Sequence, residues 1–525
     1  MRPGALGASR PALVLTVALW FLALVAAAHA AAAAGPKVLS AKHVPLVAPA
    51  GVTLSLTAKV RGAGGANVVG LVLGDAQGSA TGGLALGQGV RGSGRKVRRV
   101  VVRGLVPATV ALGELRTLLV CYDPAGAVAG HGSCRKAGRI ATAGASTEER
   151  LAAARLAGRI PAAGAVLLGL QRLTGDGSVP SELRGDASGP GGEQTAVKSA
   201  SGSFGALPLA VRRKVLPFFV PPSVPGSAWR VPGRNFRRGR ATAAAATADC
   251  TGYDSLELGV GVKHTSADSY PWAPVPTADG KAIFWYGTVR DPRLKPGEEA
   301  DHASAQRYAA AFPAIWKKLT AEFGAPKSDA KEVCYHGPDG RLDIYVGEGL
   351  IAINGGRHSF ATQALTIPYA SGGKFCTNRP SFILARAGLS NWALAHEFMH
   401  VLQFSHRYAS CDEPISWWDE GGATWAGDFV YPDDNFEQRT FPGLVADPLK
   451  ADLTKLDYEA WPFWMMLQRT QGTGVLRSIF AQLAAQRSVP AVDAAISGGY
   501  AKQIPRFYLH VFNQSPVGDQ GFEIP

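Results

Sequence analysis

The stretch SNWALAHEFMHVLQFS, residues 390–405, decides which fold the sequence favours. Ser390 can cap a helix here, because its hydroxyl can accept a hydrogen bond from a backbone N–H that lacks a partner in the first turn. Apolar residues then follow at helical spacing: Leu394, Phe398, Val401 and Leu402. The pattern predicts an amphipathic helix that starts at Ser390 and turns its apolar stripe toward a core.

Two histidines of this predicted helix are four residues apart. His396 and His400 would lie one turn apart on one face, so that both imidazoles could bind a single ion. Glu397, which follows the first histidine, could then take a proton from a water on that ion. The alternative is that both are surface histidines; we expect His358 and His406 to be ordinary polar residues. The motif therefore indicates a metal site but does not establish one alone.

A third ligand is offered downstream by the sequence WWDEGGATWAGDFV, residues 417–430. Glu420 would lie on a second helix, and two histidines with one carboxylate leave zinc an open fourth position, as catalytic sites need. Thr424, one turn later, could orient a ligand. Glu420 could instead simply begin a helix, in which case the third ligand lies elsewhere, with Glu413 and Asp428 as the candidates.

The chain is long, and its first residues indicate export. With 525 residues it exceeds one ordinary core, so we expect two or three folded units. Arg2 and Arg10 precede an apolar run that ends at Ala28-His29-Ala30, which predicts a secretory signal over residues 1–30. An N-terminal membrane anchor is the alternative. No second apolar run of that length follows, so we expect no membrane contact after removal of the signal.

The formal net charge is +14 at pH 7. Such a charge would favour anionic cell-surface polymers as partners. Nucleic acid is not an expected partner, because the arginines are scattered through strand-like and linker segments and no nucleic-acid-binding module is recognisable.

Six cysteines follow the predicted signal, and an even number in an exported chain suggests three disulfides. Cys121 and Cys134 flank a Gly-rich turn and are the best local pair. The other four allow three connectivities, among which the sequence does not choose; Cys334 with Cys376 is our working pair. None of the six has CxxC spacing, so a structural zinc–thiolate site is not expected.

The chain after the signal divides into three regions. Residues 31–142 show alternating apolar positions and turn signals typical of an antiparallel β-sandwich. Residues 143–245 start with a capping box at Ser146 and Glu149 and continue as a helical pre-catalytic segment with linkers. Residues 246–525 read as an α+β domain, with strands expected in KAIFWYGTV, RLDIYVG and SFILARA. We also expect a helix that ends at Gly324. Its apolar positions recur at helical spacing and should face inward: Tyr308, Phe312, Ile315, Trp316, Leu319 and Phe323.

Two stretches resemble known proteins. LLVCYDPAGAVAGHGSC, residues 118–134, resembles the last hairpin of immunoglobulin-like adhesion modules of exported bacterial proteins. Residues 334–435, with LAHEFMHVLQFS and CDEPISWWDEGGATWAGDFVYPDDN, resemble the gluzincin clan of zinc peptidases. They are more closely similar to a group of exported bacterial metalloproteases, which also shows the patterns of residues 156–186 and 215–229. This second resemblance covers about residues 146–515.

The resemblance implies a zincin-like catalytic domain and a role for each site residue. His396 and His400 would be the first two zinc ligands, Glu420 the third, and Glu397 the general base. Tyr458 stands where related gluzincins often carry a tyrosine that donates to the developing oxyanion; the alternative is a core aromatic packed with Trp461, Phe463 and Trp464. One departure is Gly421-Gly422, where the group more often has an Ala-Thr-like pair, and two helix-weakening glycines could loosen Glu420.

These features predict a bacterial protein secreted to the medium or cell surface that hydrolyses polypeptides as a zinc-dependent endopeptidase. The main alternative is an adhesion or binding protein that keeps the metallopeptidase scaffold without turnover. A zinc hydrolase acting on cell-wall amides is a further alternative.

Overall fold

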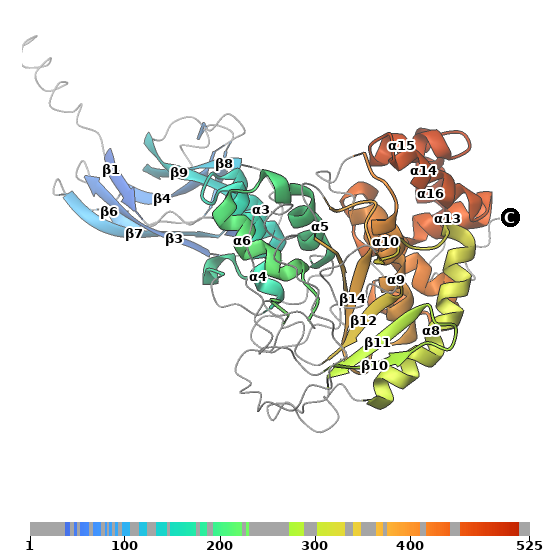
Figure 1. Cartoon of the computed structure of the whole chain (residues 1–525). Helices are drawn as coiled ribbons and strands as arrows, with labels where there is room; N and C mark the ends of the chain where they lie inside the picture. Colours follow the sequence, from blue (N-terminus) through green and yellow to red (C-terminus); the bar gives the residue numbers. More distant parts are fainter. Residues whose placement is uncertain are drawn as a thin grey trace, which may run out of the picture. The chain divides into compact units, whose positions relative to one another are not determined.

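The computed structural model of the chain contains two compact units (Figure 1). The first unit comprises Met1–Ala145 and Ala152–Arg159, and the second comprises Ser146–Leu151 and Ile160–Pro525. The structure describes residues 37–513 except 43–46, 50–52, 62–66, 75–78, 81–82, 87–89, 93–96, 106–114, 123–132, 144–146, 175–178, 186–192, 223–226, 230–271, 288–301, 331–339, 348–363, 371–374, 410–415 and 442–451. The predicted signal at residues 1–30, the predicted boundary at residue 246, and Cys334 of the working disulfide pair lie outside these ranges.

The first unit consists of two β-sheets that share one core. Its strands are β1 (Lys37–Lys42), β2 (Val47–Pro49), β3 (Thr53–Arg61), β4 (Asn67–Leu73), β5 (Leu84–Ala85), β6 (Val90–Gly92), β7 (Val97–Leu105), β8 (Leu115–Tyr122) and β9 (Ser133–Ala143). One sheet has the order β1-β3-β7, and the other has the order β2-β9-β8-β4-β5, with β6 paired to β4. Inward residues of β3, β4, β7 and β8 form the core, because every second side chain of a strand points to the same face.

Residues Cys121 and Cys134 stand opposite each other in the β8–β9 pair and form a disulfide. The pairing expected from the sequence is therefore the one present in the structure.

The second unit is built around a five-stranded sheet. Its strands are β10 (Trp272–Pro276), β11 (Ala282–Gly287), β12 (Leu342–Val346), β13 (Ala364–Pro368) and β14 (Ser381–Ala385). The order is β10-β11-β12-β14-β13, in which β11, β12 and β14 are parallel and the two edge strands are antiparallel. The central strands are almost continuously apolar because both faces of the sheet are covered by helices.

Alternate residues of these strands point into two different cores. Phe284, Ile344 and Ile383 belong to the core formed with α8 (His302–Phe323) and α9 (Asn391–Ser405). Trp285 and Tyr345 point to the other face, which short helices cover. Those helices are α4 (Ala162–Leu173), α5 (Glu193–Ser203), η2 (Phe204–Ala206), α6 (Leu209–Val215) and η3 (Leu216–Phe219), and η1 (Ser181–Leu183) lies between α4 and α5 in the chain. Residues from the predicted pre-catalytic segment therefore complete one core of this unit. Preceding them, α3 (Thr147–Leu156) is divided between the two units.

The remaining helices extend the α8–α9 side of the sheet. They are α10 (Ser416–Val430), α11 (Phe436–Thr440), η6 (Leu453–Lys455), η7 (Tyr458–Ala460), α13 (Trp461–Gln471), α14 (Gly474–Leu483), α15 (Ser488–Ala495) and α16 (Tyr500–Asn513). Figure 1 shows α13 to α16 gathered beyond α10. The predicted stripe of α8 is buried except for the partly exposed Trp316, and Gly324 follows the helix with a φ of +81°, so this prediction is confirmed.

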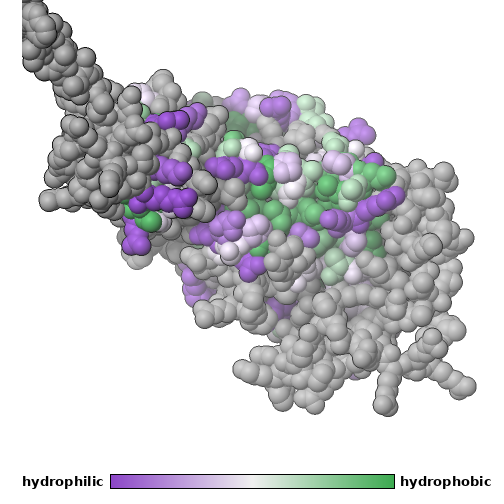
Figure 2. Space-filling view, turned by 90° about the vertical axis from the view of Figure 1, so that its left-hand side faces the viewer, coloured by the Kyte–Doolittle hydropathy of each residue, from purple (hydrophilic) through white to green (hydrophobic). Residues whose placement is uncertain are grey.

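The surface mixes hydrophobic and hydrophilic side chains on the face that Figure 2 presents. The large hydrophobic residues exposed among the described ranges lie on five different elements: Leu84, Val101, Leu156, Leu209 and Leu509. Within the described residues, no helix is both long enough and apolar enough to cross a membrane.

Candidate metal centre

Helix α9 carries the two histidines and begins where the sequence predicts. The Ser390 hydroxyl accepts a hydrogen bond from the backbone N–H of Ala393, at 3.1 Å, and so caps the helix. His396 and His400 are both buried, and their Nε2 atoms are 3.2 Å apart. The four-residue spacing therefore brings the two imidazoles together.

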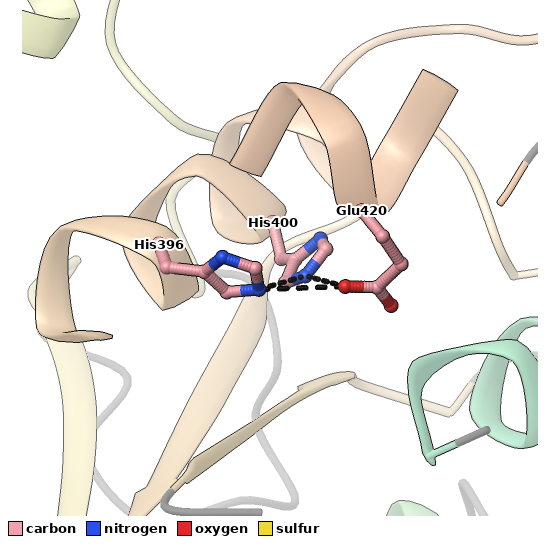
Figure 3. A group of neighbouring side chains, drawn as sticks. All are labelled: His396, His400 and Glu420. Carbon is pink, nitrogen blue, oxygen red and sulfur yellow. Dashed lines mark hydrogen bonds and ion pairs between the residues drawn. The ribbon is translucent and has the colours of Figure 1, made fainter. Parts of the chain in front are cut away.

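Helix α10 brings Glu420 to the same point. The Oε2 atom of Glu420 lies 3.4 Å from Nε2 of His396 and 3.3 Å from Nε2 of His400 (Figure 3). These three residues are the one group of potential ligands of this kind among the described residues. The third ligand predicted from the sequence is thus placed beside the first two. Of the other carboxylates considered, Asp428 is buried outside this group and Glu413 lies outside the described ranges.

The glycines after Glu420 allow α10 to pack closely. A Cβ atom on Gly422 would lie 2.4 Å from the Trp464 ring, and one on Gly421 would lie 2.9 Å from the Ala460 Cβ. Both distances are shorter than real Cβ contacts permit, so only glycine fits against η7 and α13 here. The Gly421-Gly422 pair therefore has a packing role at this helix, which the resemblance did not suggest.

The hydrogen bonds around His400 fix which nitrogen faces the centre. The amide of Gln403 donates from Nε2 to the carbonyl oxygen of Asp419, at 2.8 Å, so its Oε1 is the atom that faces His400. Nδ1 of His400 lies 2.6 Å from that oxygen and must donate to it. The neutral ring then carries its lone pair on Nε2, as a metal ligand requires.

His396 is held by aromatic rings instead. Its imidazole stacks on Trp392 with ring centroids 5.6 Å apart and on Tyr458 with centroids 5.4 Å apart. Its Nδ1 is buried with no hydrogen-bond partner among the described residues. The two histidines are thus oriented by different means, one by hydrogen bonding and one by packing.

The Glu420 carboxylate is buried beside nitrogen atoms alone. Burial opposes its ionisation, but the His400 and His396 nitrogens outweigh this effect and hold the pKa of Glu420 well below its usual range. Neither carboxylate oxygen has a hydrogen-bond donor among the described residues beyond these contacts. That stabilisation by the histidines requires protonated imidazoles; beside two neutral rings whose lone pairs face it, the buried carboxylate is costly, whereas a cation between the three atoms would satisfy all of them.

Glu397 is fixed by the edge strand β13. The Thr366 hydroxyl donates to Oε2 of Glu397 at 2.7 Å and lies 3.0 Å from the Glu397 carbonyl oxygen. Both residues are buried. One carboxylate oxygen of Glu397 is thereby oriented.

Two further predicted residues lie nearby with different surroundings. Tyr458 stacks on His396 and, with centroids 4.4 Å apart, on Phe441. Its ring lies in the same core cluster as Trp461, Phe463 and Trp464, as the alternative interpretation predicts; donation by its hydroxyl to an oxyanion stays a prediction. The Thr424 hydroxyl is buried with no hydrogen-bond partner among the described residues, so a contact that would orient a ligand is absent there.

Sequence reasoning missed four residues that contact the centre or its supports: Gln194, Lys198, Thr366 and Gln403. Gln403 follows His400 by three residues on the same helix, and that spacing alone could have identified it. The other three come from α5 and β13, which are distant in sequence, and no local pattern connects them to the motif.

No protein-family model, curated protein or solved structure matches this chain, so the function has to follow from the geometry of the centre itself.

Proposed function

We propose that the protein is a zinc-dependent metallopeptidase that binds zinc through His396, His400 and Glu420. The spacing of the three ligand atoms carries this proposal. Two atoms that each lie about 2.0–2.1 Å from a tetrahedral zinc are about 3.3–3.4 Å apart. The observed separations are 3.2, 3.3 and 3.4 Å, which is one face of such a tetrahedron.

The donor set also supports zinc rather than a harder cation. Two imidazoles with one carboxylate suit zinc, whereas magnesium and calcium prefer oxygen ligands throughout. Three protein ligands leave the fourth position open, which distinguishes a catalytic zinc site from a closed structural one.

The residues around the centre define the reaction. A zinc ion here would supply Lewis acidity toward a peptide carbonyl and toward a water. Glu397 accepts the proton of that water and delivers it to the leaving amine, while Thr366 keeps its carboxylate oriented. The Nδ1–H of His400 donates to Oε1 of Gln403, which keeps the ring oriented. Tyr458 is proposed as an oxyanion donor on the resemblance alone.

We propose a secreted or cell-surface location for the activity. The Cys121–Cys134 disulfide is the structural observation that supports it, because structural disulfides persist in oxidising compartments. The net charge of +14 supports anionic surface polymers as partners besides the polypeptide substrate.

The test uses the protein without its signal and measures zinc content together with hydrolysis of an unfolded protein. We expect one zinc per chain and activity that a chelator removes. Glu397→Gln should keep the zinc but lower turnover by about 10²- to 10⁴-fold, because the amide cannot accept the proton. Glu182→Gln, the same change at an exposed position of the second unit, should alter neither.

Three results would contradict the proposal in different ways. Absence of bound zinc would refute the metal centre. Zinc without turnover in the unmodified protein would favour the binding or adhesion alternative. Loss of zinc from Glu397→Gln would make Glu397 a ligand rather than a base.

A further inference from the structure

Helix α5 contacts two residues that support the candidate centre, although it lies far upstream of α9 in the sequence. Gln194 and Lys198 are four residues apart and so occupy one face of α5, one turn from each other. Gln194 is buried, and the Lys198 side chain is 13% exposed. These long polar side chains leave water only because the centre offers them partners.

Lys198 reaches the support of His400 and Glu420. Its Nζ lies 2.5 Å from Oδ2 of Asp419, next to Glu420 in the chain, and 5.5 Å from the centre of the Phe404 ring. The carbonyl oxygen of Asp419 accepts a hydrogen bond from Nε2 of Gln403, and Oε1 of Gln403 accepts a hydrogen bond from the Nδ1–H of His400. The ion pair therefore fixes the turn of α10 that carries Glu420 and holds Gln403.

Gln194 reaches the support of Glu397. Its Nε2 donates to the carbonyl oxygen of Thr366 at 2.9 Å. The hydroxyl of the same threonine donates to Glu397 at 2.7 Å. The position of the β13 backbone at Thr366, and through it the orientation of the Glu397 carboxylate, depends on α5.

The rest of α5 is part of the hydrophobic core. Ala196, Val197 and Ala200 are buried with Phe204 against residues of the sheet and with Phe404 of α9. Loss of this helix would expose one face of the sheet to water, at a cost proportional to the apolar area uncovered. A leader that is released to activate the centre would not be expected to share its core in this way.

We propose that Lys198 and Gln194 are positioning residues of the metal centre, and that α5 is a permanent part of the active protein. Lys198 acts on the ligands through Asp419 and Gln403, and Gln194 acts on Glu397 through Thr366. This inference rests on the proposed function, because it assigns the two residues to that same site. It predicts two separate signatures, one in metal affinity and one in turnover.

The first experiment replaces Lys198 by methionine in the full chain and measures zinc affinity per folded molecule by competition with a chelator. We expect affinity to fall by about 10- to 100-fold, as for other residues that support metal ligands. The control is Lys214→Met, the same change at an exposed lysine of α6. Lys198→Arg, which retains the charge, should recover part of the affinity.

A second variant covers the case in which Lys198→Met does not fold, since it leaves Asp419 buried without its cation. Lys198→Met with Asp419→Asn removes both charges and should restore the melting temperature. Zinc affinity should stay below that of the unmodified protein, because the link between α5 and α10 is still missing. The visible spectrum of the cobalt-substituted double variant should also differ from that of the cobalt-substituted unmodified protein.

The second experiment replaces Gln194 by leucine. We expect zinc affinity to stay unchanged while kcat falls about ten-fold with little change in KM, because the base and not the metal is displaced. Zinc affinity and kcat equal to those of the Lys214→Met control in all α5 variants would overturn the inference while leaving the proposed function intact. Faster turnover in any of them would overturn it in favour of an inhibitory α5. An unmodified protein without zinc would refute both proposals.

Discussion

The two units of the chain differ in what they bury. In the first unit, the described core consists of aliphatic side chains and Tyr122, and none of the buried charged residues among the described ranges belongs to it. The second unit buries acidic residues in an aromatic interior: Asp329, Asp343, Glu397, Asp419, Glu420, Asp428 and Glu437. A buried charge costs several kcal/mol unless it is paired, so the second unit holds its acids only because it supplies partners.

Two of these acids have aromatic N–H or O–H groups as partners rather than cationic side chains. Asp343 accepts hydrogen bonds from Trp285 at 2.8 Å and from Tyr369 at 3.0 Å, and burial, with Asp343 nearby, raises the pKa of the Tyr369 hydroxyl well above its usual value. Glu437 accepts one from Trp392 at 3.1 Å, and the same Trp392 ring stacks on His396. The second unit therefore maintains a charged interior, and Glu420 is the buried acid whose partner is a proposed ion.

The largest effect should follow the removal of the Glu420 carboxylate. Glu420→Ala leaves two histidines, so we expect zinc affinity to fall by orders of magnitude and activity to disappear, while the first unit keeps its stability. Zinc titration and near-ultraviolet circular dichroism measure the two responses.

The comparison is the neighbouring Asp419→Ala, which retains all three ligands and should still bind zinc, but with an affinity lowered by only about 10- to 100-fold, because the ion pair with Lys198 is lost. If Asp419→Ala lost zinc and Glu420→Ala kept it, the ligand assignment would be wrong by one residue.

A smaller effect should follow from adding one methyl group beside the centre. Gly422→Ala places a Cβ 2.4 Å from the Trp464 ring, and overpacking of this kind costs about 1–3 kcal/mol. We expect a lower calorimetric melting temperature for the second unit and weaker zinc binding, since Glu420 precedes this turn. Gly474→Ala, where nothing lies within 4 Å of an added Cβ, should be neutral or slightly stabilising. Equal melting temperatures for the two variants would contradict the packing role of Gly422.

The sequence predicted local features of the centre well and long-range ones poorly. Ser390, the stripe of α9 and the one-turn spacing of His396 and His400 are helical properties, and each lies where the pattern placed it. The role of Lys198 could not be predicted, because it depends on an ion pair with a residue more than two hundred positions away. The role of Gly422 was also hidden, since helix propensity describes an isolated helix and not the Trp464 ring against it.

A change in the first unit should have the opposite outcome: the stability of that unit falls, whereas zinc binding and turnover in the second unit do not change. Replacing Cys121 and Cys134 together by alanine removes a disulfide between residues 13 apart in sequence, and loops of this size contribute about 3 kcal/mol. We expect the unfolding transition of the first unit to move to lower denaturant, while zinc affinity and kcat stay as before. Loss of zinc in this variant would mean that the two units do not behave independently. Mass spectrometry of an unreduced digest should first find the Cys121–Cys134 bridge.

The smallest effect concerns His406, which follows α9 and stacks on Phe480 with ring centroids 4.7 Å apart. Burial lowers the pKa of His406 below its usual value of 6.5, more than the hydrogen bond to the Phe323 backbone raises it. The unfolded chain therefore binds this proton first, so its contribution to stability is complete above pH 6.5 and is lost as the pH falls through and below that value. His406→Gln should flatten the acid side of the stability profile of the second unit, measured by urea unfolding at several pH values. An acid-side slope equal to that of the unmodified protein would show that His406 is not buried in its neutral form.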